Sequence, residues 1–432
     1  MSGYDSREFQ RRWTPPAFDP FRSLPLMAFT RGWRSRRFAL LAPVLILIGV
    51  VASAVSGSLG GLRDFTPAVD SERLFGIGHP HASPATFPFA RDYPSWLFVM
   101  CIVLTYALVH AQWKAMRSCF PELAANGVIR PRREARCNWY QRLLRIDRLA
   151  AAARSEYAVD NMLQSCNRSF DRIASFGPVT ALVTVGIVAL LMLSEQRNGV
   201  FEVLAPPRLS DSARQAWISA SYHGWWAGSN HTLGVFVYAG IASLGLFLIV
   251  SQNIVGFVAV YCVMALPAVV EFDADWINRD GCYGWSPLGR TFRTVCWSIA
   301  LHGVAISLLL VTLGIENFRW VLVLAITWIV ILPLYLVVPI LIFRKVSKTA
   351  RKAREIEVQS GFFEAIYIAS PIEVISLEAQ ARSELEAARA ARIRPLRVGR
   401  LEVSAFIVTI LLPIVLTVIQ LVFSVSFGGG SR

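Results

Sequence analysis

Seven long apolar stretches alternate with polar connectors along the chain. They cover roughly residues 38–57, 96–112, 177–193, 234–270, 294–314, 320–343 and 404–427. None of them has Asp, Glu, Lys or Arg in its apolar centre. A helix that crosses the hydrocarbon core of about 30 Å needs roughly 20 such residues, and its backbone polar groups must be paired within the segment. The pattern therefore predicts an all-α fold, a polytopic transmembrane helix bundle of about seven spans.

The positions of Lys and Arg predict the orientation of these spans. Segments 1–37, 113–176, 271–293 and 344–403 hold 35 of the 43 basic residues, whereas connectors 58–95 and 194–233 hold three each. Because basic connectors stay on the cytosolic side, the N-terminus is predicted to be cytosolic and the C-terminus extracytosolic. This predicts a multi-pass protein of the cell membrane, and we favour the bacterial inner membrane.

Composition agrees with a membrane protein. Hydrophobic residues make up 54% of the chain and charged residues 17%, against about 25% charged residues in soluble domains. The formal charge of +14 would indicate nucleic acid in a soluble protein, but here the basic residues lie between apolar stretches. We expect contact with the lipid bilayer and with anionic lipid headgroups at the cytosolic face, and no nucleic acid. None of the seven cysteines lies in a connector predicted as external, so reduced thiols are expected.

The connectors divide the chain into seven predicted parts. In order, these are a basic cytosolic segment (1–37), two spans (38–112), a basic helical cytosolic segment (113–176), four spans (177–343), a second basic helical cytosolic segment (344–403), a seventh span (404–427) and a flexible tail (428–432). External loops are expected at 58–95 and 194–233, and a cytosolic loop at 271–293.

A cytosolic helix is predicted to begin at Ser370. The run Ser370-Pro371-Ile372-Glu373 has the residues of a capping box, and the helix is expected to stop before Pro395. We interpret it as a linker helix packed on the long fourth span. The alternative is contact with anionic lipid or an acidic partner, for which the candidate residues are Arg389, Arg392, Arg394 and Arg397.

The fourth stretch is unusually long. Residues 234–270 would extend about 55 Å as a helix, nearly twice the thickness of the hydrocarbon core. The polar triplet Ser251, Gln252 and Asn253 interrupts it near the middle. We prefer one long helix that tilts or projects into the cytosol, because two helices broken at the triplet would place the Arg-rich segment 344–403 outside. A re-entrant bend at the triplet is the other alternative.

The triplet and His302 are the candidates for a site inside the membrane. On one long helix the triplet lies near mid-membrane, and His302 lies about 12 Å into the fifth span from its cytosolic side. These depths are compatible with a hydrogen bond between neighbouring antiparallel helices. The polar groups are expected either to line a water path or to hold the helices together.

An acidic run follows the fourth stretch. Its candidate cation ligands are Glu271, Asp273, Asp275 and Asp280. Carboxylate oxygens suit a hard cation, although the spacing differs from that of an EF-hand. The alternative is a solvated loop with Asp280-Gly281 in a turn.

Histidines and aromatic residues gather in the predicted external connectors. The histidines are His79, His81, His223 and His231. They could bind a transition metal or sense pH if the two loops converge, and scattered surface histidines are the alternative. The nearby aromatic residues Trp217, Tyr222, Trp225 and Trp226 are predicted to form an interfacial belt.

Known catalytic motifs are absent from the sequence. We find no Walker loop, no nucleophile elbow, no His-Glu-x-x-His and no Cys-x-x-Cys pair, so we expect neither an enzyme nor a cofactor. Mid-membrane carboxylates, which ion-coupled transporters commonly carry, are absent as well. Two hypotheses remain, and a homo-oligomer is expected. The favoured one is a passive pore or gated channel for ions or small solutes, and the alternative is a non-conducting sensor or scaffold that signals through its basic cytosolic helices.

The predicted topology can be tested by labelling single introduced cysteines in intact cells. A cysteine near Gly199 or after Phe427 should react with a membrane-impermeant maleimide, and a cysteine at Arg351 should react only after the cells are opened. The native cysteines, none of which is predicted to be external, provide the background. Labelling at position 351 from outside intact cells would contradict the single long fourth helix.

Overall fold

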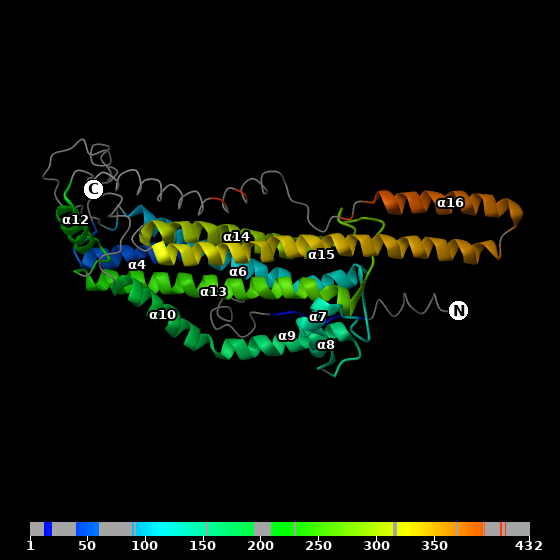
Figure 1. Cartoon of the computed structure of the whole chain (residues 1–432), viewed down its shortest axis with the longest axis horizontal. Coiled ribbons are helices and arrows are strands. Elements are labelled where there is room, and N and C mark those ends of the chain that lie inside the picture. Colours follow the sequence, from blue (N-terminus) through cyan, green and yellow to red (C-terminus); the bar gives the residue numbers. More distant parts are fainter. Residues whose placement is uncertain are drawn as a thin grey trace.

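The computed structural model describes residues 13–19, 40–59, 89, 92–193 except 153, 209–313 except 229, 318–391 except 369, and 393, 407 and 411. The fold is mostly helical (Figure 1). The helices are α4 (Leu41–Val55), α6 (Tyr93–Ala125), α7 (Trp139–Leu143), α8 (Ile146–Ala151), α9 (Ala158–Ser175), α10 (Gly177–Leu193), α12 (Asp211–His223), α13 (Thr232–Val269), α14 (Ser286–Leu313), α15 (Phe318–Ile366) and α16 (Pro371–Ala390). Two short antiparallel strands are also present, β1 (Ile129–Pro131) and β2 (Val270–Phe272).

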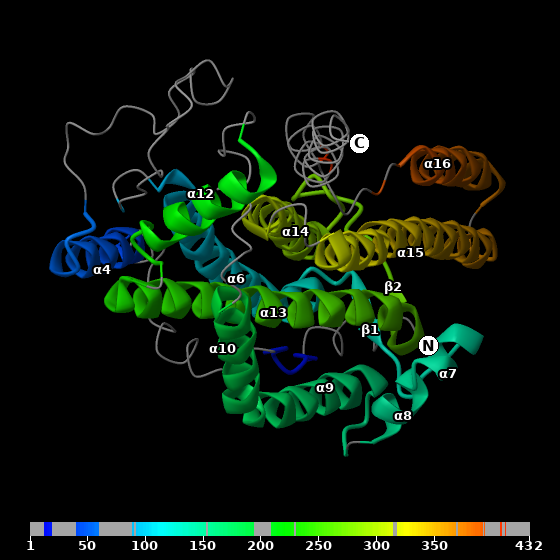
Figure 2. The ribbon, with the colours of Figure 1, turned by 60° about the vertical axis from the view of Figure 1, so that its left-hand side comes forward.

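Long helices lie side by side and form a bundle. Figures 1 and 2 show α6, α13, α14 and α15 along the long axis, with α4 and α10 at the periphery. One end of the bundle carries buried aromatic residues and the start of α6, and we name it the aromatic end. The other end carries β1, β2 and the start of α14, and we name it the strand end.

Two of the described helices are long and apolar enough to cross a membrane. They are Ser95–Ala125, within α6, and Thr232–Val269, which is α13. The pair Ala158–Ile173 and Gly177–Ala189 is bent by 52° and would make a third span if the two were counted as one. Helix α4 is apolar but has only 15 residues.

Helix α13 shows whether the polar triplet interrupts the fourth apolar stretch. It is one continuous helix of 38 residues, and Ser251, Gln252 and Asn253 lie within it. The prediction of a single long helix is confirmed, and the predictions of a break or a re-entrant bend at the triplet are wrong. Side chains of the triplet bond within the helix or to a neighbouring helix, which removes the reason for the backbone to break.

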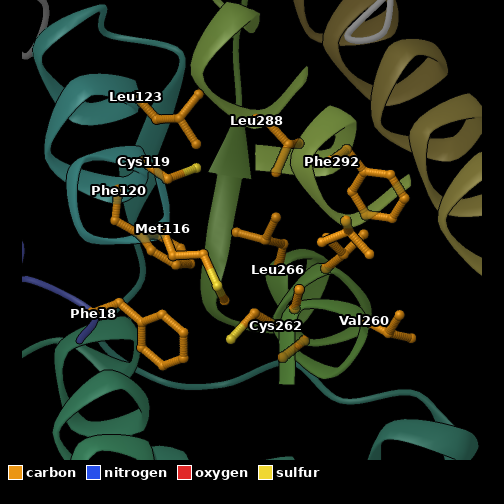
Figure 3. Close-up of a cluster of buried hydrophobic side chains, with 14 of the residues drawn as sticks. Phe18, Met116, Cys119, Phe120, Leu123, Val260, Cys262, Leu266, Leu288 and Phe292 are labelled. Atoms are coloured by element: carbon orange, nitrogen blue, oxygen red, sulfur yellow. The ribbon is translucent and has the colours of Figure 1, made fainter. Parts of the chain in front are cut away.

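The core is concentrated between α6, α13 and α14 near the strand end. Figure 3 shows Met116 and Phe120 of α6 facing Cys262 and Leu266 of α13, with side chains of α14 above them. Phe18, from the N-terminal segment 13–19, is 1% exposed and packs edge-on against Phe120 and against Phe170 of α9. The N-terminal segment is thus part of the core.

The aromatic end is built around the carboxylate of Asp92. This side chain is buried and accepts hydrogen bonds from the indole N–H groups of Trp225 (2.6 Å) and Trp226 (2.7 Å) and from the hydroxyl of Ser95 (2.6 Å). The predicted interfacial belt is wrong for the cluster Trp217, Tyr222, Trp225 and Trp226, whose side chains are all buried. Asp92 is a buried acceptor for the indoles of Trp225 and Trp226, so these two need no lipid headgroup as a partner, whereas Trp217 Nε1 has no hydrogen-bond partner among the described residues.

Large apolar side chains remain exposed along the outside of the bundle. They include Val44, Leu47 and Val51 of α4, Leu97, Met100 and Leu104 of α6, Val179, Leu182 and Val183 of α10, and Phe236 and Phe257 of α13. Contiguous exposed apolar surface is rare on soluble monomers, so this surface and the apolar helices suggest membrane association.

Helices α15 and α16 form a hairpin that extends beyond the strand end of the bundle (Figure 1). Helix α16 begins with the predicted capping box, because Ser370 and Glu373 bond each other as expected. The helix ends at Ala390. It packs against α15, with Glu384 paired to Arg354 at 3.3 Å, and the prediction that it packs on the long fourth span is wrong. The surface for α16 is provided instead by α15, which continues over 49 residues to Ile366.

Removing the Asp92 carboxylate should destabilise the aromatic end. Asp92→Ala would leave two buried indole N–H groups and a hydroxyl without an acceptor, and we expect the free energy of unfolding to fall by about 3 kcal/mol. Denaturant titration in detergent, followed by tryptophan fluorescence, measures this loss. The control is Asp211→Ala, at an exposed aspartate in the first turn of α12. Equal stability of the two variants would contradict the role assigned to Asp92.

Candidate functional site

A chain of polar side chains connects three helices in the middle of the bundle. We name it the polar network, and it consists of Gln112 of α6, Gln252 of α13, and Ser298 and His302 of α14. His302 Nε2 lies 2.9 Å from Gln252 Oε1, and Gln252 Nε2 donates to Ser298 Oγ. Ser298 Oγ lies 3.5 Å from Gln112 Oε1 and donates to the carbonyl of Thr294 at 3.0 Å. All four side chains are at most 3% exposed.

The hydrogen-bond pattern assigns donors and acceptors along the polar network. The amide nitrogen of Gln252 must donate, so its Oε1 is free to accept. His302 then donates through a protonated Nε2, which fixes its tautomer. The hydroxyl of Ser298 accepts from Gln252 and has one hydrogen to donate, either to the carbonyl of Thr294 at 3.0 Å or to Gln112 Oε1 at 3.5 Å. Gln112 Nε2 is buried and has no hydrogen-bond partner in the described part of the chain.

The network lies deep in the bundle. Gln252 is 20 residues after the start of α13, about 30 Å along the helix, and His302 is 16 residues after the start of α14, about 24 Å. The structure thus brings together Gln252 and His302, two residues that the sequence singled out. Gln112 was missed because it ends an apolar stretch, where a polar residue normally marks the interface. Ser298 was missed because serine is common in membrane helices and gives no signal.

The rest of the polar triplet faces elsewhere. Ser251 Oγ donates to the carbonyl of Phe247 at 2.8 Å, and Asn253 Nδ2 donates to the carbonyl of Ile249 at 3.0 Å. Both bonds stay within α13. The triplet is therefore not a single site, because three consecutive residues of a helix point in three directions.

The acidic loop after α13 uses its carboxylates to hold its own structure together. Asp273 pairs with Arg130 at 2.6 Å, and Glu271 pairs with Arg132 at 3.5 Å. Asp275 Oδ1 accepts from the backbone N–H of Ile277 at 3.2 Å. Among the described residues, no group of three or more His, Cys, Asp or Glu side chains is arranged to hold a metal ion.

Asp280 organises the turn that leads into α14. Its carboxylate accepts backbone N–H bonds from Cys282 (2.8 Å), Gly284 (2.8 Å) and Ser286 (3.0 Å). Burial works to raise the pKa of Asp280, but these hydrogen bonds favour the charged form and hold the pKa below its ordinary value. Gly284 has φ +85°, a conformation that glycine adopts easily, and its carbonyl accepts from Asn126 Nδ2 of the α6 C-cap at 2.9 Å.

The histidines and arginines singled out from the sequence are only partly described. His223 ends α12 and contacts the ring of Tyr222, and His231 precedes α13. Arg389 pairs with Glu355 of α15 at 3.6 Å. His79, His81, Arg392, Arg394 and Arg397 lie outside the described residues.

Comparisons with known proteins assign no family or function. No protein-family model matches the chain, and neither curated proteins nor solved structures give a match. The polar network is thus the site that the geometry itself singles out.

Breaking the polar network should loosen the helix contacts. Gln252→Leu removes the partner of both His302 and Ser298, and we expect it to lower the free energy of unfolding by about 1 kcal/mol, since interhelical polar pairs in membranes average about 0.6 kcal/mol. His302→Leu should cause a smaller loss. The matched control is Ser251→Ala, whose hydroxyl donates to the carbonyl of Phe247 within α13. Unfolding midpoints in one detergent give the comparison, and a larger loss in the control than in Gln252→Leu would be evidence against the network.

Proposed function

We propose that the protein is a polytopic membrane protein with seven spans, a cytosolic N-terminus and an extracytosolic C-terminus. The exposed apolar faces of α4, α6, α10 and α13 support this proposal, because lipid is the partner that such surfaces fit. The basic connectors support the orientation, with the strand end and the hairpin on the cytosolic side.

Within this framework we propose a membrane-anchored scaffold whose output is the α15–α16 hairpin. The observation that carries this is the length of α15, which continues from Phe343, the last residue of the apolar stretch, to Ile366 without a break. Those 23 residues extend about 35 Å, far beyond the headgroups. An arm of this reach is suited to holding a partner protein away from the membrane surface, which favours the scaffold.

The base of the hairpin holds the arm in a defined direction. The guanidinium of Arg354 on α15 lies 5.8 Å from the centre of the Trp276 ring, in the loop after β2. It also bonds Glu357 at 3.0 Å and Glu384 of α16 at 3.3 Å. One side chain thus joins the bundle, α15 and α16, so the hairpin cannot swing freely on its helix.

The tip of the hairpin has the chemistry of a binding surface. Five large apolar side chains are exposed there, with Tyr367 at 91% and Ile368 at 90%; the set, which we name the tip, is Phe363, Tyr367, Ile368, Ile372 and Ile375. Residues 355–381 contain five Glu and neither Lys nor Arg, although the whole chain has a formal charge of +14. This acidic, apolar end complements a basic amphipathic helix of a partner protein.

A gated channel is the second candidate. It is favoured by the polar network, because a hydrogen-bonded histidine and two amides at mid-bundle could rearrange into a hydrated path. In the scaffold these same groups act as interhelical contacts. The two candidates therefore predict different effects of disrupting the network: a change in flux for the channel, and a loss of stability without any flux for the scaffold.

The scaffold proposal predicts binding at the tip and no ion flux. A fluorescent Lys/Leu amphipathic helical peptide should bind the full protein in nanodiscs, and Phe363→Ser with Ile372→Ser should weaken it at least tenfold because the apolar contacts are lost. Fluorescence anisotropy measures the affinity. The matched control is Ile356→Ser, which removes an exposed isoleucine of the same hairpin outside the tip.

Flux measurements in liposomes decide between the two candidates. The scaffold predicts no flux from the purified protein at any voltage or pH, and none from Gln252→Leu. Flux that Gln252→Leu or His302→Leu alters at equal amounts of folded protein would favour the channel. Equal peptide affinity in the tip variant and its control would overturn the proposed output surface.

A further inference from the structure

Helices α7 and α8 present an exposed aromatic and basic surface at the strand end. Trp139 is 79% exposed and Leu143 is 76% exposed, which is unusual for side chains of this size. Arg142 lies on the same helical face, because residues at i, i+3 and i+4 are neighbours on a helix. Arg145 and Arg148 follow and are exposed as well. We name these five residues the foot.

The foot is held rigidly from behind. Gln141, on the opposite face of α7, is fully buried and donates from Nε2 to the carbonyl of Met264 on α13 at 2.9 Å. Its Oε1 accepts from the backbone N–H of Asn138 at 3.0 Å, which closes the capping box of α7. The backbone N–H of Arg136 also donates to the carbonyl of Ala268 at 2.9 Å. Trp139 and Leu143 therefore point outward because the fold fixes α7, and not because the segment is loose.

The corner between α7 and α8 is made by Arg145. Its φ is +56°, a left-handed conformation that residues with a side chain seldom adopt. Ile146 follows directly and is fully buried, which anchors α8 to the core. This corner places Arg145 at the outer edge of the foot, between Arg142 and Arg148.

In the proposed topology, the foot lies close to the lipid headgroups. Apolar side chains remain exposed on α13 as far as Phe257, and the anchor of α7 at Met264 is seven residues further on, about 10 Å toward the strand end. The headgroup layer begins at the end of the hydrocarbon core and is roughly 5–8 Å thick. Long Arg and Trp side chains reach back into this layer from such a position.

The charges of the foot are available to a ligand. Arg142, Arg145 and Arg148 form no ion pair with the described residues, and Asp147 is the acidic residue among them. Other arginines nearby are already engaged, as Arg133 is with Glu156 at 3.2 Å. Guanidinium groups bind phosphate with two parallel hydrogen bonds, and tryptophan prefers the boundary between headgroups and hydrocarbon.

We propose that the foot is a binding site for anionic phospholipids of the cytosolic leaflet. Arg142, Arg145 and Arg148 bind the phosphates, and Trp139 and Leu143 lie at the edge of the hydrocarbon. Each arginine near an anionic surface strengthens binding about fivefold. This inference rests on the proposed topology, which places the strand end on the cytosolic side.

Fluorescence quenching in nanodiscs tests the proposal with the full chain. The discs contain phosphatidylcholine with a nitroxide on its headgroup, with or without 30% phosphatidylglycerol. The signal of Trp139 is the difference between the wild type and Trp139→Phe. We expect at least twofold stronger quenching of Trp139 in the anionic discs. The triple variant Arg142→Gln, Arg145→Gln, Arg148→Gln should reduce quenching to the level of the neutral discs, whereas Arg382→Gln, at an exposed arginine of α16, should not.

A second tryptophan separates failure of the foot from failure of the topology. Trp297 is 40% exposed on α14, beside the polar network, and Trp297→Phe gives its signal with a nitroxide placed on the acyl chain. Quenching of Trp297 without lipid-dependent quenching of Trp139 would overturn the foot and leave the membrane proposal standing. Lack of quenching at both positions would overturn the membrane proposal itself. Retained quenching of Trp139 in the triple variant would also overturn the assignment of phosphate binding to the arginines.

Discussion

The free-energy cost of leaving a polar group unpaired in an apolar interior determines where the helices of this bundle meet. Gln252 bonds two side chains of α14, and Ser298 lies beside Gln112 of α6. At the aromatic end, Asp92 gathers two indoles and a hydroxyl. Apolar surfaces alone tolerate sliding, whereas these directional bonds do not. The polar junctions therefore set the register of α6, α13 and α14, and apolar packing fills the space between them.

The same principle connects the bundle to the loops and short helices at its strand end. The backbone of β2 pairs with β1, the carboxylate of Asp280 holds the turn into α14, and Gln141 fastens α7 to α13. Each of these bonds lies at a strand or near a helix end, where backbone N–H and C=O groups would otherwise be unpaired. Besides the exposed apolar faces of the bundle, two surfaces of the described residues are distinct: the tip at the far end of the hairpin and the foot at the strand end. One is acidic and the other is basic, which suits them to different partners.

Sequence patterns predicted the parts of the fold that depend on local order. The length of α13 and the capping box at Ser370 followed from the residues themselves, and the spacing of Gln252 and His302 allowed their contact. Tertiary partners could not be predicted. Nothing in the sequence around Trp225 and Trp226 indicates that Asp92, more than 130 residues earlier, accepts from both. The acidic loop allowed two interpretations from the sequence, a cation site or a turn, and in the structure its carboxylates accept from backbone N–H groups and pair with arginines.

Helix α15 is continuous from the bundle to the turn of the hairpin, so a movement at one end is transmitted to the other. Between Phe343 and Ile366, helix α15 contains no Pro, and its one Gly, Gly361, lies near the end, so a change in the tilt of this part of α15 is carried along most of its length. A tilt of about 10° would displace the tip by about 6 Å, given an arm of about 35 Å. Rotation of α15 about its own axis would instead change the direction in which the tip faces, with little displacement. A small change at the bundle end of α15 is in this way converted into a movement of several ångströms at the tip.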